Sequence, residues 1–184
     1  KQQYLALWQM VKERFEDNDV VNVIFAYSPQ ATDDASEKAY LDRYPGDDNI
    51  DIMGINAYCH AEEGDSTALS TFAEELSMNL KMLTELGKKH NKPTAITETG
   101  YRSIPCDNWW THTLSQAIGN YPISYVMIWR NAHEVANHYY VPFPGQRSIE
   151  DFVAYYNEKR TLFLHDINGL YLEKKVDNSK QNNK

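Results

Sequence analysis

Residues 93–129 read PTAITETGYRSIPCDNWWTHTLSQAIGNYPISYVMIW, and this stretch decides the fold. A short apolar run at 93–98 ends in a glutamate and a Thr-Gly pair, which is typical of a buried strand. A second such run fills 123–129. Between the two runs, apolar residues recur at helical spacing over 110–118, and Asp107 stands where a helix N-cap is expected. The stretch therefore predicts a strand, a helix and a second strand.

The same alternation extends toward the N-terminus. Leucines at helical spacing and closing lysines predict a helix of about six turns over 67–90. The runs IDIMGINAY at 50–58 and VVNVIFAY at 20–27 predict two more buried strands. Residues 31–49 are polar and predict a loop with a short helix. An apolar stripe over 4–15 predicts a leading helix.

The C-terminal part contains a long loop and a final helix. Residues 131–147 predict the loop, and Ser148-x-x-Asp151 resembles a capping box at the start of a last long helix. The end of the chain, EKKVDNSKQNNK at 173–184, is polar and is expected to fray. We therefore expect one domain over 1–172 and a polar tail.

The predicted order is one helix followed by four strand and helix units. The strands are continuous apolar runs, which favours a parallel sheet covered by helices. An open doubly wound sheet and a (β/α) barrel both fit this order. No glycine-rich phosphate loop follows any strand, so the barrel is favoured. A complete barrel takes about 250 residues and eight strands, however, and only four strands are visible here.

Composition excludes several classes of function. The chain has 184 residues, 42% of them hydrophobic, so it can bury a core. It carries 18 basic and 26 acidic residues, a net charge of −8, without a basic cluster, which argues against a nucleic-acid partner. No apolar run approaches the roughly 20 residues of a membrane helix, and the first residues do not resemble a signal peptide. The aromatic content of 12% suits sugar ligands, although aromatic side chains also simply fill cores.

Three side chains at the predicted strand ends suggest a site. Glu98 closes an apolar strand, where a carboxylate must be paired, desolvated at a cost or used in chemistry. A salt bridge to Arg130 or Arg102 would be the structural explanation. Tyr58 and Trp129 end the flanking strands, and a phenol can orient a carboxylate while an indole provides a flat surface for a sugar ring. Both can also be packed core aromatics.

Other reactive side chains do not assemble into a site. Cys59 and His60 are adjacent on a strand and therefore point to opposite faces, which argues against a nucleophile pair. Two cysteines do not fix the redox compartment. Three aspartates match no calcium-loop spacing, and two histidines lack a third ligand. These residues are Asp47, Asp48, Asp51, His133 and His138. No metal and no cofactor are expected.

The strand ends resemble those of the C-terminal half of glycoside hydrolase family 26, the β-mannanase family of the retaining (β/α)8 glycosidases. The resemblance covers nearly the whole chain. The matching stretches are FAYSPQ, YLDRYPGDDNIDIMGINAYC, KPTAITETG, ISYVMIWRNA and HYYVPFPGQRSIEDF. The resemblance implies an α/β fold of the TIM-barrel type, of which this chain supplies strands five to eight and helices four to eight.

The resemblance also implies an activity and its residues. Glu98 aligns with the family's nucleophile, Tyr58 with the tyrosine that orients it, and Trp129 with the tryptophan under the sugar. Asn56 and Asn131 are expected to contact sugar, and Asn56 stands where the family often has aspartate. The implied reaction is retaining hydrolysis of β-1,4-mannosidic bonds in mannan, galactomannan or glucomannan. The implied location is secreted or periplasmic.

One part of the family's machinery is absent. The acid/base glutamate of the family follows the fourth strand, before the helix that opens this chain. Retaining hydrolysis needs two carboxylates about 5 to 5.5 Å apart. Glu62, Glu63 and Glu134 lie on loops after strands, but nothing places them across the cleft. We therefore expect this chain alone to be inactive.

Three hypotheses remain. The first is half of an endo-β-1,4-mannanase barrel. The second is an incomplete fragment or glycan-binding half-barrel that associates with another chain or copy through its open sheet edges. The third, a small nucleotide-binding domain, needs a phosphate loop that the sequence lacks. Substrate choice among mannan, xylan and mixed-linkage glucan, and endo or exo action, depend on loop shape.

Overall fold

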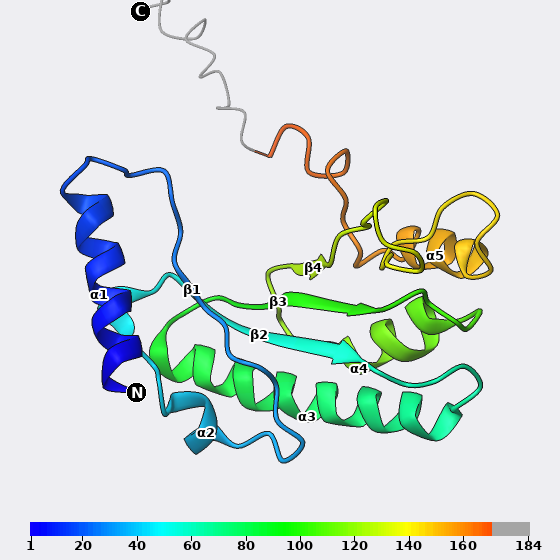
Figure 1. Cartoon of the computed structure of the whole chain (residues 1–184), viewed down its shortest axis with the longest axis horizontal. Coiled ribbons are helices and arrows are strands. Elements are labelled where there is room, and N and C mark those ends of the chain that lie inside the picture. The colour runs from blue at the N-terminus through cyan, green and yellow to red at the C-terminus, as the bar shows by residue number, and fades with distance from the viewer. Residues whose placement is uncertain (171–184) are drawn as a thin grey trace, which may run out of the picture.

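The computed structural model describes residues 1–170 and contains a parallel four-stranded sheet in the order β1-β2-β3-β4 (Figure 1). Consecutive strands are neighbours and all three pairings are parallel, which confirms the predicted topology. The strands are β1 (Ala26–Tyr27), β2 (Ile52–Cys59), β3 (Thr94–Tyr101) and β4 (Val126–Ile128). The tail predicted at 173–184 lies outside the described residues.

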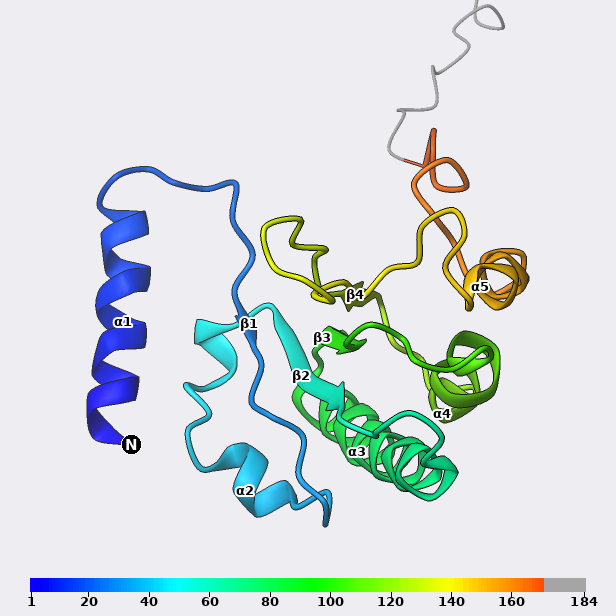
Figure 2. The same cartoon turned by 45° about the vertical axis from the view of Figure 1, so that its right-hand side comes forward.

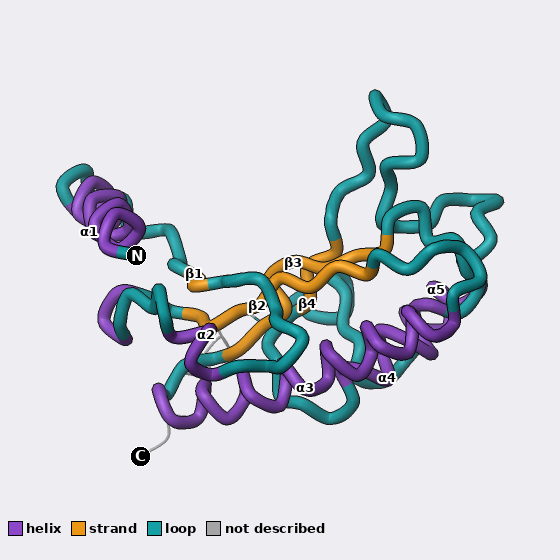
Figure 3. Tube along the Cα trace, turned by 60° about the horizontal axis from the view of Figure 1, so that its bottom comes forward, coloured by secondary structure: helices purple, strands orange, loops and turns teal. Residues whose placement is uncertain are grey.

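The helices cover one face of this sheet. Figures 2 and 3 place α3, α4 and α5 on the same side of the strands, while α1 stands beside β1. The helices are α1 (Gln2–Glu16), α2 (Glu37–Leu41), α3 (Ser66–His90), α4 (Gln116–Ile118) and α5 (Ile149–Tyr156). A 3-10 turn at Asp47–Asn49 and a π-helical turn at Trp109–Ser115 complete the set. One helix-covered face is the arrangement that a barrel segment requires.

The main core lies between α3 and the sheet. Leu76, Leu80 and Leu83 of α3 are fully or almost fully buried in one cluster with Ile55 and Ile96 of the strands. The core-facing leucines of α3 are three or four residues apart, which is the spacing of one helix face, and they pack against the side chains of β2 and β3 that point to this side of the sheet.

Close packing at the end of α3 requires a glycine. A Cβ atom on Gly87 would lie 2.4 Å from the Thr94 methyl group and 2.8 Å from the Lys92 carbonyl oxygen. Because the carbonyl belongs to the backbone, it cannot move aside cheaply. Gly87 thus lets the last turns of α3 approach the start of β3.

The predicted strand at 20–27 is wrong in most of its length. Only Ala26–Tyr27 forms β1, while Val21 and Ile24 are 91% and 71% exposed. The backbone hydrogen bonds of Phe25 are on the side of β2 only: its carbonyl oxygen accepts from the N–H groups of Asp51 and Ile52. A run of apolar residues becomes a buried strand only when neighbours cover it, and no strand lies beyond β1 within residues 1–170.

The last helix begins after Ser148, as predicted, but the side-chain caps predicted at Asp107 and Ser148 are wrong. Asn108 precedes the π-helical turn without a side-chain cap, and Ser148 donates to Gln146 rather than capping α5. Asp151, expected in the capping box of its own helix, instead accepts the backbone N–H groups of Trp110 and Thr111 at 2.8 and 3.2 Å. The last helix is eight residues long rather than extended. A carboxylate remote in sequence has therefore replaced the local caps.

Candidate active site

Over a short stretch after Ile96, strand β3 has one residue more than the paired stretch of either neighbouring strand. Ile55 of β2 pairs with Ile96, but the next residue, Asn56, pairs with Glu98, which leaves Thr97 unpaired. The pairing of β3 with β4 shifts register over the same stretch. This is a β-bulge, which twists a strand locally and changes the direction of the side chains that follow it.

The bulge decides which face Glu98 occupies. Side chains alternate along a strand, and Ile96 is fully buried in the core beneath the sheet. Regular alternation would return Glu98 to that helix-covered face. With the extra residue, Glu98 lies in register with Asn56 on the opposite face. Thr97 shares this face, because a Cβ atom on Gly54 would lie 2.3 Å from its methyl group.

Glu98 and Tyr58 form a hydrogen-bonded pair in the carboxyl-terminal halves of β3 and β2. The strand predicted to end at Glu98 continues to Tyr101, so Glu98 stands three residues before its strand ends and Tyr58 one residue before. The Tyr58 hydroxyl donates to Oε1 of Glu98 at 2.5 Å, and both residues are half-buried. Burial, followed by the hydrogen bond to the Glu98 carboxylate, raises the pKa of Tyr58 well above its usual value. Tyr58 therefore remains a proton donor to the carboxylate.

Neither arginine considered from the sequence pairs with Glu98. Arg130 lies 3.3 Å from Glu134, and Arg102 donates to a carbonyl oxygen of the loop after β4. Within residues 1–170, the structure gives Glu98 no salt bridge. Its carboxylate is thus held by a neutral phenol, which leaves its charge available for other chemistry.

Asn56 lies on the same face, beside Glu98 in the register of the sheet. Its Oδ1 atom accepts from Ser28 Oγ at 2.7 Å and from Thr97 Oγ1 at 3.1 Å. The hydroxyls of Ser28 and Thr97 also lie in hydrogen-bond contact with each other. The oxygen of Asn56 thus supports the bulge. A sugar contact by Asn56 remains a prediction.

Trp129 and Asn131 follow β4. Trp129 is half-buried, and its backbone N–H donates to the Thr99 carbonyl oxygen at 2.9 Å. The Asn131 amide is bonded to the backbone of its own loop: Oδ1 accepts from the N–H groups of Tyr140 and Val141 at 2.8 and 3.0 Å, and Nδ2 donates to the Val141 carbonyl oxygen. Their contacts with sugar also remain predictions.

Tyr140 is a neighbour of the pair that the sequence did not identify. Its ring centroid lies 5.7 Å from that of Tyr58, at an interplanar angle of 69°. A Cβ atom on Gly100 would lie 2.4 Å from the Tyr140 ring, so the ring lies directly over β3. Gly100, two residues after Glu98, was the available signal, because a strand glycine often marks a close approach of another group.

The three carboxylates considered as substitute acids lie on the loops. Glu63 pairs with Arg147 at 2.5 Å and Glu134 pairs with Arg130 at 3.3 Å, while Glu62 is exposed. No hydrogen bond connects any of them to Tyr58 or Glu98 in the part of the chain that the structure describes. Arg147 also contacts Asp107 at 2.5 Å, so one side chain links the loops after β2, β3 and β4.

The other side chains considered as reactive from the sequence are buried, exposed or bonded to neighbours away from Glu98. Cys59 is buried and His60 is exposed, which confirms that the two point to opposite faces. Burial raises the pKa of the Cys59 thiol to about 11. Asp47 contacts His90 at 2.8 Å, and Asp51 accepts the N–H of Phe25 at 2.8 Å. Residues 1–170 contain no group of three side chains placed to hold a metal ion.

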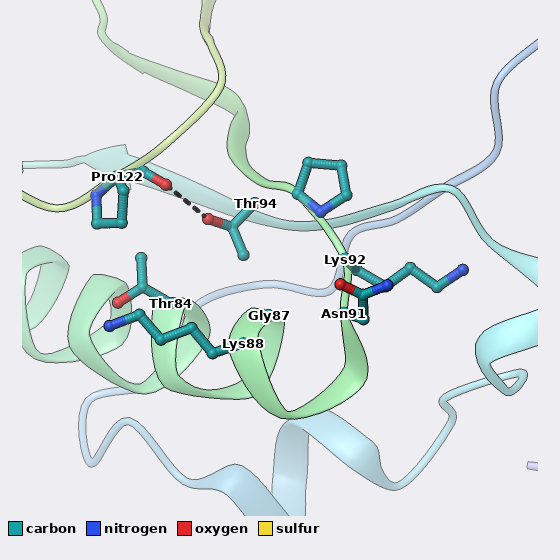
Figure 4. Close-up of a pocket in the computed structure, with 8 residues that line it drawn as sticks. Thr84, Gly87, Lys88, Asn91, Lys92, Thr94 and Pro122 are labelled. Atoms are coloured by element: carbon teal, nitrogen blue, oxygen red, sulfur yellow. Dashed lines mark hydrogen bonds between the residues drawn. The ribbon is translucent and has the colours of Figure 1, made fainter.

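A cavity of about 330 Å³ lies at the opposite end of the strands (Figure 4). It opens between the end of α3 and the starts of β3 and β4, where Thr94 Oγ1 donates to the Pro122 carbonyl oxygen at 3.3 Å. In barrels of this type, chemistry takes place at the carboxyl ends of strands. The lining residues are Thr84, Gly87, Lys88, Asn91, Lys92, Pro93, Thr94 and Pro122.

Comparison with known proteins gives consistent matches. The model of "Glycosyl hydrolase family 26" matches residues 1–128. A mannan endo-1,4-beta-mannosidase of Bifidobacterium adolescentis is 25% identical over 183 residues, which cover 92% of this chain and 18% of that protein. The solved structure of a family 26 β-mannanase from Bacteroides ovatus is 46% identical, with a TM-score of 0.81. The catalytic domain of an endo-β-1,4-mannanase from Bacillus sp. JAMB-750 is 28% identical, with a TM-score of 0.80.

The chain spans less than half the length of these proteins. It covers 46% of the Bacteroides chain and 47% of the Bacillus chain, while 90% and 93% of its own residues are aligned. The four-stranded sheet thus corresponds to half of a TIM barrel. None of the helices within residues 1–170 has the length and apolar character needed to cross a membrane.

Proposed function

Because the chain belongs to glycosyl hydrolase family 26, we propose that it carries the nucleophile half of a retaining endo-β-1,4-mannanase. The substrates are mannan, galactomannan or glucomannan. Residues 1–172 form the barrel half and 173–184 a tail. The enzyme acts outside the cytoplasm, secreted or periplasmic, where such polysaccharides are found.

The observation that carries this proposal is the hydrogen-bonded pair of Tyr58 and Glu98 in the carboxyl-terminal halves of adjacent strands. The Glu98 carboxylate attacks the anomeric carbon and forms a covalent glycosyl-enzyme, which water then hydrolyses. Tyr58 donates to one carboxylate oxygen and so orients the other toward the sugar. Trp129 provides an apolar surface for the sugar ring, and Asn56 and Asn131 supply polar contacts.

The proposal assigns the acid/base role to a carboxylate outside this chain. Retaining hydrolysis needs that group about 5 to 5.5 Å from the nucleophile to protonate the leaving oxygen. The three loop glutamates are ion-paired elsewhere or exposed. We therefore expect residues 1–184 alone not to cleave mannan, but to retain the attack on a sugar whose leaving group needs no proton.

A mannobiosyl fluoride with fluorine at C2 of the reacting sugar tests this attack. Glu98 forms a bond to the anomeric carbon while the carbon–fluorine bond breaks and fluoride leaves, so no acid is needed. Mass spectrometry of the intact chain and of its peptides should locate the adduct on Glu98. Glu98→Gln should abolish the adduct, whereas Glu63→Gln, on an exposed loop, should retain it. An adduct on another residue would refute the assignment.

The whole barrel tests the activity itself. In an enzyme that contains both halves, Glu98→Ala should abolish mannan hydrolysis while circular dichroism shows an intact fold. Normal turnover by Glu98→Ala would refute the proposed function. Parallel assays on xylan and mixed-linkage glucan identify the preferred substrate.

A second function is favoured by the sheet edges. The outer edges of β1 and β4 have no partner strand within residues 1–170, and Val21, Ile24 and Tyr125 beside them are exposed. Unpaired edges with apolar side chains promote association. As an alternative we propose a half-barrel that binds glycan and pairs with another copy or chain. Sedimentation of the 184-residue chain should then show dimers, and an active monomer would contradict this alternative.

A further inference from the structure

We propose that Tyr140 is a positioning residue of the active site: its ring holds the Tyr58 phenol against Glu98, and Asn131 fixes Tyr140 in that place. The inference deepens the proposed function and rests on it for its catalytic consequence. The packing part of the inference can be tested without any activity.

The first observation is the contact between Tyr140 and Gly100. A Cβ atom on Gly100 would lie 2.4, 3.1 and 3.2 Å from three atoms of the Tyr140 ring. A side chain at position 100 would therefore occupy the space of the ring. The ring thus covers the backbone of β3 two residues beyond Glu98.

The second observation is the edge contact between Tyr140 and Tyr58. Their ring centroids are 5.7 Å apart at an angle of 69°, the perpendicular arrangement that aromatic pairs favour. Tyr58 is therefore held from two directions, by its hydrogen bond to Glu98 and by this ring. The ring of His60, directly after β2, lies with its centroid 6.4 Å from that of Tyr58. The titratable groups that face Tyr58 are thus Glu98, Tyr140 and His60.

The third observation is that Tyr140 is fixed by its own loop. Asn131 Oδ1 accepts the Tyr140 N–H, and the Ala132 N–H donates to the His138 carbonyl oxygen at 2.8 Å. The Ser103 N–H donates to the Tyr139 carbonyl oxygen at 2.8 Å, which ties this loop to the loop after β3. These bonds limit how far the ring can move.

The Tyr140 hydroxyl makes no hydrogen bond within the described part of the chain, so the ring itself performs the role. Without the ring, water reaches the Tyr58 phenol and competes for its proton. The phenol then loses part of its burial and of its bond to Glu98, the two largest causes of its raised pKa, whereas the charge of the Tyr140 hydroxyl is a smaller cause. Tyr140→Ala should therefore lower the pKa of Tyr58 more than Tyr140→Phe, which removes only the smaller cause and keeps the ring.

The test is NMR titration of the 184-residue chain labelled with 13C at the tyrosine Cζ atoms. The Tyr58 resonance is assigned from its absence in Tyr58→Phe. In the parent chain this resonance should not titrate near pH 10, where ordinary tyrosines ionise. In Tyr140→Ala its midpoint should fall by at least about one pH unit, and in Tyr140→Phe it should fall clearly less. Equal titration in Tyr140→Ala and the parent, or an equal fall in Tyr140→Phe and Tyr140→Ala, would overturn the inference.

Gly100→Ala provides a second variant if Tyr140→Ala does not fold. It retains Tyr140 but displaces its ring, so it should lower the Tyr58 midpoint in the same direction. Asn131→Ala should have a smaller effect of the same sign. A Gly100→Ala chain that folds and titrates like the parent overturns the inference.

The catalytic consequence is tested by a double-mutant cycle in the whole barrel. Tyr140→Ala should lower kcat/KM for mannan about tenfold or more in the parent, but less than about twofold in a Tyr58→Phe background. Equal losses in both backgrounds would show a general structural effect and overturn the positioning role. Glu98→Ala, measured in the same series, separates failure of the proposed function from failure of the Tyr140 inference. If Glu98→Ala keeps its activity, the proposed function is refuted. The NMR titration still decides whether Tyr140 holds Tyr58 in place.

Discussion

A methyl group added at Gly54 should disturb the bulge that places Glu98. The new Cβ atom would lie 2.3 Å from the Thr97 methyl carbon and 2.8 Å from the Thr97 hydroxyl oxygen. Ordinary contacts begin near 3.4 Å, so Thr97 must retreat by roughly 1 Å. Gly54→Ala therefore acts on the bulge from the neighbouring strand without altering the reacting groups.

The cost follows from what Thr97 would give up. Overpacking of a buried site costs about 1 to 3 kcal/mol. The single proton of the Thr97 hydroxyl is shared between two acceptors, the Ile55 carbonyl oxygen at 3.0 Å and Asn56 Oδ1 at 3.1 Å, and loss of this hydrogen bond adds about 1 kcal/mol. We expect the free energy of unfolding to fall by about 2 to 4 kcal/mol. For a chain of this size the Tm should fall by roughly 5 to 15 °C.

A matched second substitution makes the test specific. Thr97→Ser removes the methyl carbon that lies closest to the new Cβ atom but keeps the hydroxyl. It should cost less than about 1.5 kcal/mol alone, and it should recover about half of the loss in the Gly54→Ala/Thr97→Ser double variant. Urea unfolding followed by circular dichroism measures all four free energies.

Two results would refute this reasoning. A Gly54→Ala chain as stable as the parent would mean that Thr97 does not fill the space over Gly54. Strict additivity of the two substitutions would mean that they do not touch. Either result would remove the structural basis for the face that Glu98 occupies.

Three further predictions concern packing and charge. Asp151→Ala should lower the free energy of unfolding by about 1 to 3 kcal/mol, because the backbone N–H groups of Trp110 and Thr111 lose their acceptor. The control is Glu150→Gln at the exposed neighbouring position, which should change the free energy of unfolding little. Urea titrations measure both. Burial raises the pKa of Cys59 to about 11 and also raises the pKa of Cys106, but Cys106 is partly exposed whereas Cys59 is buried. Iodoacetamide at pH 8 should therefore label Cys106 first. Peptide mapping that found Cys59 modified first in the folded chain would contradict this. Arg147→Ala should change Tm by only about 2 °C, because the ion pairs of Arg147 are exposed. It should nevertheless speed amide hydrogen exchange in all three loops that Arg147 connects. High salt, which screens these ion pairs, should have the same effect on amide exchange in the parent.

The parts of the fold that follow from periodicity were predictable. Helix α3 and strands β2 and β3 bury one face or both faces, so their sequences repeat with the period of the element. Glu98 and Tyr58 were predictable because both lie in the carboxyl-terminal halves of parallel strands that are neighbours in sequence order. Parallel strands bring their carboxyl ends to one edge, so the pair could be placed before any coordinates.

The parts that depend on remote partners were not predictable. The apolar run before β1 has the composition of a buried strand, but burial also requires a neighbour on its outer side. The cap supplied by Asp151 and the ring of Tyr140 come from residues far along the chain, and no local pattern records such contacts. The bulge at Thr97 is a single unpaired residue inside an apolar run, which periodicity alone cannot detect.

Because side chains alternate between the two faces of a strand, the number of residues between Ile96 and Glu98 determines which face Glu98 occupies. Adding or deleting one residue between Ile96 and Glu98 would exchange the two faces of the sheet and turn the carboxylate toward the helices, whereas adding two would keep it on its present face. The loops before and after this strand can vary in length without that penalty. Within β3, therefore, a change of length before Glu98 is tolerated only in steps of two.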